Sequence, residues 1–189
     1  MDVDSFQQEI KYCSRCGSKI EQIEIDSAGH MHHICLRCDA VFYDNPKIIV
    51  NTLIECNNKI LLCKRAVKPK IGFWTLPGGY MESNETTDGA AIRETKEETG
   101  VDVKNLQLYA LFNCPAINQV YFIFRGHVHN ENTCTSEETS EVKYFSECDI
   151  PWENLSYGLM RQVLDWYFQD KTEGKYRFRT DDTYEICPD

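Results

Sequence analysis

The chain has 189 residues, of which 42% are hydrophobic, and a formal net charge of −10 at pH 7. This length allows one domain of ordinary size and a short additional module. Because contacts to a nucleic-acid backbone need a basic surface, the negative charge makes nucleic acid an unlikely main partner by composition alone. No apolar stretch approaches transmembrane length, so we expect no membrane association. The N-terminus lacks the basic flank and apolar core of a signal peptide, which predicts a cytoplasmic protein.

Two cysteine pairs near the N-terminus have the spacing of a metal site. Each pair is C-x2-C, eighteen residues separate them, and the four residues are Cys13, Cys16, Cys35 and Cys38. This pattern is typical of a zinc ribbon, in which four thiolates bind a structural Zn²⁺ that contributes folding energy to a short segment. His30, His32 and His33 precede the second pair, so a site with three thiolates and one imidazole remains an alternative.

The hydrophobic pattern predicts a ribbon over residues 1–44, a main domain over 45–170 and a C-terminal tail over 171–189. The expected strands are residues 47–55, 59–64, 73–76, 106–113, 120–129 and 142–145. Asn57 and Asn58 predict a hairpin turn between the first two strands. A helical apolar stripe covers residues 155–168. The six cysteines outside the ribbon are expected to be reduced thiols: Cys56, Cys63, Cys114, Cys134, Cys148 and Cys187.

Three glutamates are expected on one face of a further helix. Glu94, Glu97 and Glu98 stand at i, i+3 and i+4, which places their side chains side by side. Like charges at this spacing destabilise a helix in water, so a bound divalent cation would explain the pattern. Carboxylate oxygens are ligands that Mg²⁺ and Mn²⁺ favour. We expect Thr86 to cap the start of this helix and Gly100 to end it.

The residues around this helix resemble the Nudix box. The matching positions are Gly79, Glu85, Arg93-Glu94, Glu97-Glu98, Gly100 and Val101. Thr95 stands where the motif usually has an aliphatic residue, and we expect its methyl group to pack while its hydroxyl bonds to the preceding turn. The resemblance covers roughly residues 46–170. It implies an α/β fold, the Nudix α/β/α sandwich with a mixed sheet, here preceded by the zinc ribbon.

The resemblance also implies roles for the charged residues. Glu94, Glu97 and Glu98 would hold Mg²⁺ or Mn²⁺, and Glu97 or Glu98 would accept a proton from the attacking water. Arg93 would hold Glu97 through a charge-assisted hydrogen bond. Glu85 would anchor the loop or coordinate indirectly.

Nudix enzymes often add a carboxylate from a later loop. Glu137, Glu138 and Glu141 are the candidates here, and spacing does not separate them. We prefer Glu141 as the additional catalytic residue because it directly precedes the strand at Val142.

Contacts to the substrate are harder to predict. The bare backbone of Gly79 suits close approach of an anionic ligand. Gln119 is a candidate for hydrogen bonding to a base edge, and Arg65, with Lys64, for a phosphate or a solvated sheet edge. The candidates for stacking on a base are Phe73, Trp74 and Tyr121, although aromatic residues in strands mostly form the core.

The expected function is metal-dependent hydrolysis of a nucleoside diphosphate linked to another moiety. Ribbon-bearing NADH pyrophosphatases have a Pro- and Trp-rich stretch after the box, which this chain lacks. Segments 43–47, 62–65 and 115–121 are more similar to ribbon-bearing Nudix proteins that hydrolyse ADP-ribose and FAD, so AMP and a second phosphorylated product are expected. The alternatives are an NADH or nucleoside triphosphate pyrophosphatase, hydrolysis of a capped RNA end, and a non-catalytic nucleotide-sensing module. The tail could pack on a partner subunit of a homodimer.

Overall fold

The structure is a computed structural model that describes residues 10–24 and 31–183. The chain forms two compact units, Met1–Pro46 and Lys47–Asp189, and each is described by itself. The first unit contains a three-stranded antiparallel sheet in the order β1-β2-β3, formed by Glu21–Glu24, Met31–Ile34 and Val41–Phe42. Its small core holds Cys13, Cys35 and Ala40, with Ile20 and Phe42 packed against them.

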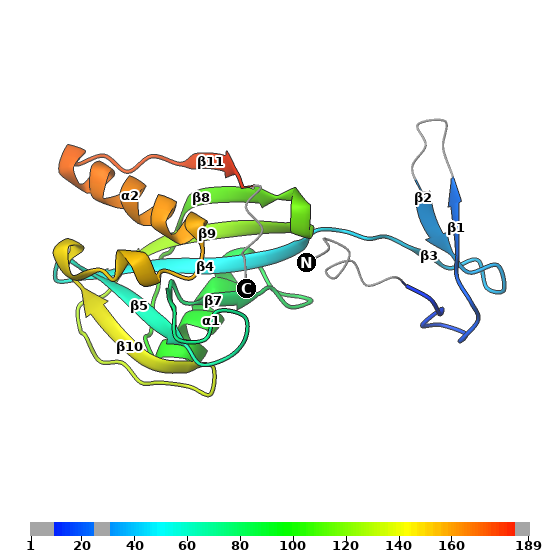
Figure 1. Ribbon diagram of the computed structural model, residues 1–189, viewed down its shortest axis with the longest axis horizontal. Helices are drawn as coiled ribbons and strands as arrows, with labels where there is room; N and C mark the ends of the chain where they lie inside the picture. The colour runs from blue at the N-terminus through cyan, green and yellow to red at the C-terminus, as the bar shows by residue number, and fades with distance from the viewer. Residues whose placement is uncertain (1–9, 25–30, 184–189) are drawn as a thin grey trace. The chain divides into compact units, whose positions relative to one another are not determined.

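The second unit is built on an eight-stranded mixed sheet, shown in Figure 1. The continuous strand order is β10-β5-β4-β9-β8-β11, while β6 pairs with β5 and β7 with β4. The β4–β9 and β8–β11 pairs are parallel, and the other pairs are antiparallel. The strands are β4 Lys47–Cys56, β5 Lys59–Arg65, β6 Trp74–Thr75, β7 Gly78–Tyr80, β8 Gln107–Cys114, β9 Gln119–His127, β10 Thr139–Phe145 and β11 Arg179–Asp182.

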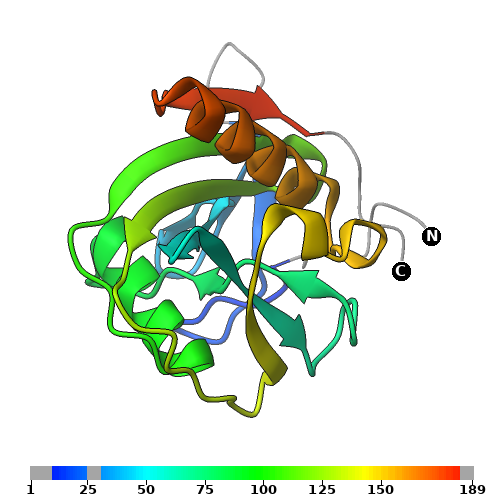
Figure 2. The ribbon, with the colours of Figure 1, turned by 90° about the vertical axis from the view of Figure 1, so that its left-hand side faces the viewer.

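Two α-helices cover opposite faces of this sheet. They are α1 Thr87–Thr99 and α2 Gly158–Glu173, and short 3₁₀ helices cover Pro115–Ile117, Glu147–Asp149 and Trp152–Asn154. Alternation along β4 explains the layers, because successive side chains of a strand point to opposite faces. Val50 packs against Ala90 and Ala91 of α1, whereas Ile49 and Leu53 join the core cluster that contains α2. Figure 2 shows the two helices on either side of the strands, so the expected α/β/α architecture is confirmed.

The β4–β5 connection is the hairpin turn expected from the sequence. Asn57 and Asn58 take positive φ angles of 49° and 65°. Two successive left-handed residues are the conformation of a type I′ turn, and asparagine adopts it more readily than most residues. The turn lets β5 return beside β4, with Glu55 opposite Ile60.

The described part of the segment expected to form a tail, residues 171–183, contains regular structure. Helix α2 continues to Glu173, and β11 adds a parallel strand beside β8. The anchor is Asp170, which has no exposed side-chain surface and accepts a 2.7 Å hydrogen bond from Nη1 of Arg179. The Tyr109 hydroxyl also donates to Asp170, at 2.9 Å. The polar sequence of β11 gave no sign of a strand because this anchoring depends on tertiary contacts.

Candidate active site

Helix α1 has the ends expected from its sequence. The Thr86 hydroxyl oxygen accepts a hydrogen bond from the Gly89 backbone N–H at 3.2 Å, which satisfies one unpaired donor of the first turn. Gly100 adopts φ 74° and donates its N–H to the Lys96 carbonyl at 2.9 Å. Only a residue without a Cβ reaches this left-handed conformation without strain. These two ends fix which residues of the glutamate-rich segment are helical.

Thr95 anchors α1 to the sheet. Its side chain is fully buried, and its hydroxyl donates to the Ala91 carbonyl at 2.7 Å. The same oxygen lies 2.6 Å from the hydroxyl of Thr52 on β4. The hydrogen bond to the preceding turn is the one expected from the sequence, while the contact with Thr52 gives the polar substitution a partner in the core. Thr95 therefore holds the helix at a fixed position beside β4.

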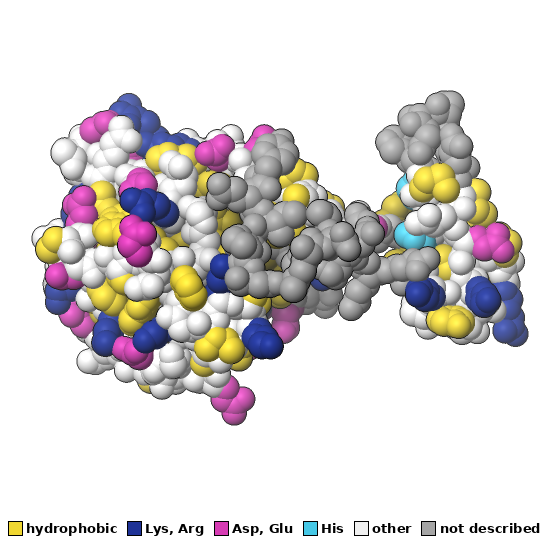
Figure 3. Space-filling view, viewed as in Figure 1, with side chains coloured by type: hydrophobic (Ala, Val, Ile, Leu, Met, Phe, Trp, Pro, Cys, Tyr) yellow, Lys and Arg dark blue, Asp and Glu magenta, His cyan; other side chains and the backbone are white. Residues whose placement is uncertain are grey.

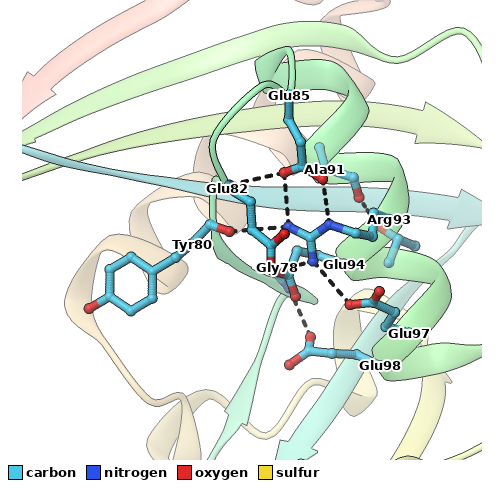
Figure 4. A network of polar contacts seen from close by, with 10 residues as sticks. Gly78, Tyr80, Glu82, Glu85, Ala91, Arg93, Glu94, Glu97 and Glu98 are labelled. Carbon is cyan, nitrogen blue, oxygen red and sulfur yellow. Dashed lines mark hydrogen bonds and ion pairs between the residues drawn. The ribbon is translucent and has the colours of Figure 1, made fainter.

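Arg93 is the centre of the acidic site. Its guanidinium donates to both carboxylate oxygens of Glu85, at 2.6 and 3.0 Å, and to Glu94 and Glu97 at 2.9 and 3.0 Å. It also donates to the Tyr80 backbone carbonyl at 3.2 Å. Figure 4 shows this fan of contacts between α1 and the loop before it. Hydrogen bonding to Arg93 lowers the pKa of Glu85 to about 2, so Glu85 is a permanently charged anchor for the arginine.

Glu98 is the most deeply buried member of the acidic cluster, with 9% of its surface exposed. Its Oε2 accepts a 2.8 Å hydrogen bond from the Gly78 backbone N–H, and the Cys63 thiol lies 3.8 Å from the same oxygen. Burial raises the pKa of Glu98 to about 7. A carboxyl group whose pKa lies near 7 is able to exchange a proton at physiological pH. The contact with Cys63 was not predicted.

Glu94 lies against the glycine loop. A Cβ on Gly79 would come within 2.7 Å of the Glu94 carboxyl carbon, so the two groups are close only because residue 79 has no side chain. Burial raises the pKa of Glu94 as well. The missing side chain of Gly79 is therefore what lets the Glu94 carboxylate lie against the main chain.

Glu97 is the outermost of the three helix glutamates, with 58% of its side chain exposed. Among the described residues, no three glutamates bring ligand atoms within 4.8 Å of one another, because Arg93 holds Glu94 and Glu97 while Gly78 holds Glu98. The carboxylate oxygens of these glutamates are nevertheless ligands that Mg²⁺ and Mn²⁺ favour. Arg93 occupies one carboxylate oxygen of Glu94 and one of Glu97, which leaves the second oxygen of each for a cation.

The preferred later carboxylate, Glu141, lies away from this cluster. It forms ion pairs with Lys64 at 2.7 Å and Lys143 at 2.6 Å, and these two lysines lower its pKa to about 2. The charge of Glu138, in contrast, raises the pKa of both Glu94 and Glu98. Glu138 is thus electrostatically coupled to the helix glutamates, whereas Glu141 is paired with lysines. Strand β10 begins three residues earlier than expected and places Glu141 opposite Lys64.

The predicted contacts for a base are arranged differently from the expectation. Tyr121 and Trp74 are 9% and 7% exposed and belong to the core cluster, so their rings offer little surface for stacking. The Tyr121 hydroxyl donates to the Gln119 side-chain oxygen at 2.9 Å, and the Gln119 amide donates to the Tyr80 hydroxyl at 3.2 Å. Phe73 is half-buried, with the Lys70 ammonium 5.5 Å from its ring centre. The exposed ring beside the acidic site is therefore Tyr80.

Arg65, the last residue of β5, is a further charged residue that influences the acidic site. Its Nε donates to the Pro69 carbonyl at 2.7 Å, and its guanidinium is 5.9 Å from the centre of the Tyr157 ring. The positive charge of Arg65 opposes the rise in the Glu98 pKa, so the two groups interact electrostatically. Lys64, which was considered beside it, is occupied by Glu141. Arg65 remains the better placed of the two for an anionic ligand.

The four N-terminal cysteines form a compact cluster. Their sulfur atoms all lie within 4.8 Å of one another, with 3.6 Å between Cys13 and Cys38 and 3.4 Å between Cys16 and Cys35. Tetrahedral zinc with Zn–S bonds of about 2.3 Å places its sulfurs about 3.8 Å apart, so the cluster is compatible with a zinc ribbon. The Arg15 backbone N–H lies 3.4 Å from the Cys13 sulfur, as a donor to a thiolate would.

The two described histidines near this cluster, His32 and His33, do not join it. His33 contacts the Gln22 amide at 3.0 Å, and the His32 ring packs edge-on against Tyr43 at 5.2 Å. His30 lies outside the described residues, as does Cys187. Within the described residues the four thiols are the one group that satisfies the geometry of a metal site with at least three ligands.

Known proteins match this chain in both sequence and structure. The NUDIX domain profile matches residues 46–167. A NUDIX hydrolase from Nitrosomonas europaea has a crystal structure that superposes with a TM-score of 0.88 and 36% identity, covering 93% of this chain and all of that one. An ADP-ribose pyrophosphatase from Methanocaldococcus jannaschii is 42% identical over 86 residues, which are 46% of this chain and 48% of that protein.

A second kind of relative covers more of the chain. The NAD-capped RNA hydrolase NudC of Pseudomonas fluorescens is 25% identical over 168 residues, which are 87% of this chain and 58% of that protein. The chain thus spans about half the length of these two curated relatives. In the described residues, no helix is long and apolar enough to span a membrane.

Proposed function

Because this chain belongs to the Nudix family, we propose that it is a divalent-metal-dependent pyrophosphohydrolase of a nucleoside diphosphate linked to another moiety. ADP-ribose and FAD are the leading substrates, and AMP with ribose 5-phosphate or FMN the products. The observation that carries the proposal is the acidic site on the second half of α1. There Arg93 holds three carboxylates while Glu98 is buried against the Gly78 N–H. The ADP-ribose pyrophosphatase among the relatives supports this substrate class.

Each charged residue of the site has a part in this proposal. Glu94, Glu97 and Glu98 would hold Mg²⁺ or Mn²⁺, which supplies charge neutralisation at the phosphates and a more acidic bound water. Glu98, whose pKa is raised to about 7, and Glu138 are the groups placed to accept a proton. Arg93 keeps the carboxylates together before the ion binds.

The pyrophosphate of the substrate would lie close to the glycine main chain before α1 and to the positive charge of Arg65. Gly79 lies directly against the Glu94 carboxylate with no side chain between them, so a phosphate bound at the carboxylates would also be close to this main chain. Arg65 lies on the Glu98 side and offers a fixed positive charge.

The four cysteines would hold one structural Zn²⁺. A site closed by four thiolates leaves no position for substrate or water, so the ion would stabilise the first unit and take no part in hydrolysis. Most of the energy that folds this short unit would then come from the metal, because its core contains few buried residues.

The purified protein should be incubated with Mg²⁺ and each of ADP-ribose, FAD, NADH and nucleoside triphosphates, and the products separated by chromatography. We expect AMP from ADP-ribose or FAD without inorganic phosphate. Consumption of NADH or a triphosphate alone would reassign the substrate and keep the metal site. Binding of a nucleotide without any cleavage would instead favour a sensor.

A capped RNA end is the second candidate substrate. The relation to an NAD-capped RNA hydrolase over 87% of this chain favours testing it. On the face shown in Figure 3, acidic and basic side chains of the described residues are interspersed rather than gathered into a basic surface. The net charge of −10 also opposes strong binding to a long RNA backbone. We therefore rank this substrate below ADP-ribose and FAD, and a 5′-NAD-capped RNA oligonucleotide belongs in the same assay.

A further inference from the structure

The loop between β9 and β10 is joined to the C-terminal end of α1. The last four backbone carbonyls of an α-helix have no partner within the helix, and those of Glu98 and Thr99 belong to this group. The Thr139 hydroxyl donates to the Glu98 carbonyl at 2.8 Å, and the Cys134 N–H donates to the Thr99 carbonyl at 2.9 Å. Figure 2 shows the loop passing beside α1 before it enters β10. The loop is therefore fixed to the helix that carries the three glutamates.

Thr139 is a buried residue in an exposed stretch of chain. Only 1% of its surface is exposed, whereas its neighbours Glu138 and Ser140 are both exposed. Besides donating to the Glu98 carbonyl, its hydroxyl oxygen accepts a 3.0 Å hydrogen bond from the Ser136 N–H. A valine in its place would have a similar shape but would leave the helix carbonyl without this donor, and a buried polar group without a partner is costly.

The main chain of Glu138, directly before Thr139, is held from two directions. Its N–H donates to the Ser136 hydroxyl at 3.2 Å, and its carbonyl accepts a 2.8 Å hydrogen bond from the N–H of Ala66, the residue after β5. The backbone around Glu138 is thus anchored to the end of β5 on one side and, through Thr139, to α1 on the other.

The place of the Glu138 charge matters to the acidic site. This charge raises the pKa of both Glu94 and Glu98, and the interaction between charges weakens as their separation grows. If the loop were released from α1, the Glu138 carboxylate would no longer be kept at a fixed distance from the helix glutamates. Its effect on a proton or a cation held by the helix would then be smaller.

We propose that Thr139 is a positioning residue of the acidic site, which sets the place of the Glu138 carboxylate by joining its loop to the Glu98 carbonyl. Thr139 would act through Glu138 and not on the substrate itself. A displacement of about 1 Å in a reacting group can cost roughly 10² in rate, so one such hydrogen bond can matter. This inference rests on the proposed function, because it concerns the loop carboxylate of the same site.

Removal of the hydroxyl tests the role of Thr139. In Thr139→Val, we expect kcat for ADP-ribose or FAD to fall about 10- to 100-fold. The KM should stay within about 3-fold of wild type, because the substrate makes no contact with Thr139 in this proposal. Thr139→Ser keeps the hydroxyl and should recover most of the lost kcat. The matched control is Thr172→Val, which removes a hydroxyl that donates to the Phe168 carbonyl of α2 at 3.0 Å and should change neither constant.

A double-mutant cycle with Glu138→Gln distinguishes positioning from a general loss of structure. If Thr139 acts through Glu138, Thr139→Val should change kcat less than about 2-fold in the Glu138→Gln background. A defect confined to α1 would instead lower kcat by the same factor in both backgrounds. Equal losses in the two backgrounds, or full kcat in Thr139→Val alone, would overturn the proposal.

Calorimetry of Mn²⁺ without substrate separates this inference from the proposed function. A negative charge near the helix glutamates favours a bound cation, so Mn²⁺ should bind about 2- to 10-fold more weakly to Thr139→Val than to wild type. The difference should disappear in the Glu138→Gln background. If this pattern is found but the wild type cleaves no nucleoside diphosphate, the positioning role survives and the proposed function fails. If the wild type cleaves ADP-ribose or FAD but the cycle shows equal losses, the function survives and the positioning role is wrong. A wild type that neither cleaves these substrates nor binds Mn²⁺ would exclude both.

Discussion

The two candidate metal sites of this protein are organised in opposite ways. The four thiols of the first unit already converge, with every sulfur within 4.8 Å of the others. The three glutamates of α1 do not converge in this way: Glu94 and Glu97 share one nitrogen of Arg93, and Glu98 is held separately by the Gly78 N–H. The first unit has a small core, so without a metal ion on its four thiols few other contacts stabilise it. The glutamates, in contrast, belong to a helix that packs on the large core of the second unit. The ribbon should therefore depend on its metal for folding, and the acidic site only for activity.

Loss of one thiol should have the largest effect. Cys38→Ser removes a zinc ligand, and structural zinc contributes about 10–16 kcal/mol of apparent binding energy in comparable small modules. We expect zinc content to fall from one ion per chain to nearly none, with residues up to about 44 unfolded. Elemental analysis and limited proteolysis report these changes.

Cys56→Ser, which alters a buried cysteine of the second unit, is the matched control and should retain zinc. Wild-type protein purified without chelator and found free of zinc would contradict the assignment. Nuclear magnetic resonance of the α1 residues should still respond to Mg²⁺ in Cys38→Ser, because the acidic site belongs to the other unit.

Glu98→Gln should abolish most of the hydrolysis and leave the fold intact. We expect kcat to fall by roughly 10²–10⁴, the range for losing a group that acts on protons or charge in the transition state. Wild-type turnover at low Mg²⁺ would remove Glu98 from the site. Glu141→Gln is the matched control and should keep nearly full activity, because its carboxylate is paired with two lysines elsewhere.

Glu98→Gln should also change how the stability of the protein depends on pH. The pKa of Glu98 is raised from 4.5 to about 7 in the folded protein, so the folded state binds the proton more tightly than the unfolded state. Wild-type stability in Mg²⁺-free buffer should then decrease between about pH 4.5 and 7, as the buried carboxyl ionises. Glu98→Gln should lack this decrease. Denaturant melts at pH 5 and pH 8 measure it, and an identical pH dependence in both proteins would argue against the shifted pKa.

Asp170 is a buried charged residue of the second unit, and replacing it should lower stability independently of any metal ion. Asp170→Asn breaks a buried ion pair with Arg179, for which a loss of about 3–5 kcal/mol is typical. Arg179 holds the pKa of Asp170 well below its usual range, so this contribution is present above about pH 4 and is lost as pH falls. Wild type should therefore lose its advantage over Asp170→Asn in acid. A constant difference between pH 7 and pH 2.5 in urea melts would contradict this account.

The cap of α1 should matter least. Thr86→Ala removes the acceptor for the Gly89 N–H, which costs about 1 kcal/mol in helices of this kind. Thermal melting should show the loss, and Thr86→Ser should restore most of it. Hydrolysis at saturating Mg²⁺ should be nearly unchanged, because the carboxylates lie in the later turns of α1. A loss of activity much larger than the loss of stability would show that the first turn also shapes the site.

The sequence was most informative where the determinants are local. Thr86, Gly100 and the spacing of the glutamates define α1 between the two caps, and the structure has the helix at those positions. The core strands were also recognisable, because buried β-branched runs and the Asn57-Asn58 turn are local signals.

Long-range contacts explain what the sequence did not reveal. Glu138 and Glu141 differ only in how the register of β10 against β5 places them, and a shift between Thr139 and Glu141 interrupts that register. Tyr80 was overlooked because its exposure depends on strands that are distant in sequence. The aromatic residue directly after Gly79 was the one local sign. Strand β11 has no strand-like composition at all.

Strand β11 also has a consequence for synthesis of the chain on the ribosome. Asp170 is enclosed by α2 and the sheet, but its counterion, Arg179, is made nine residues later. Until residues 177–182 have emerged, closing α2 over the sheet would leave a carboxylate without its partner in an apolar setting, which is costly. We expect the nascent domain to keep α2 undocked up to that point, so that final closure of the fold follows translation of this strand.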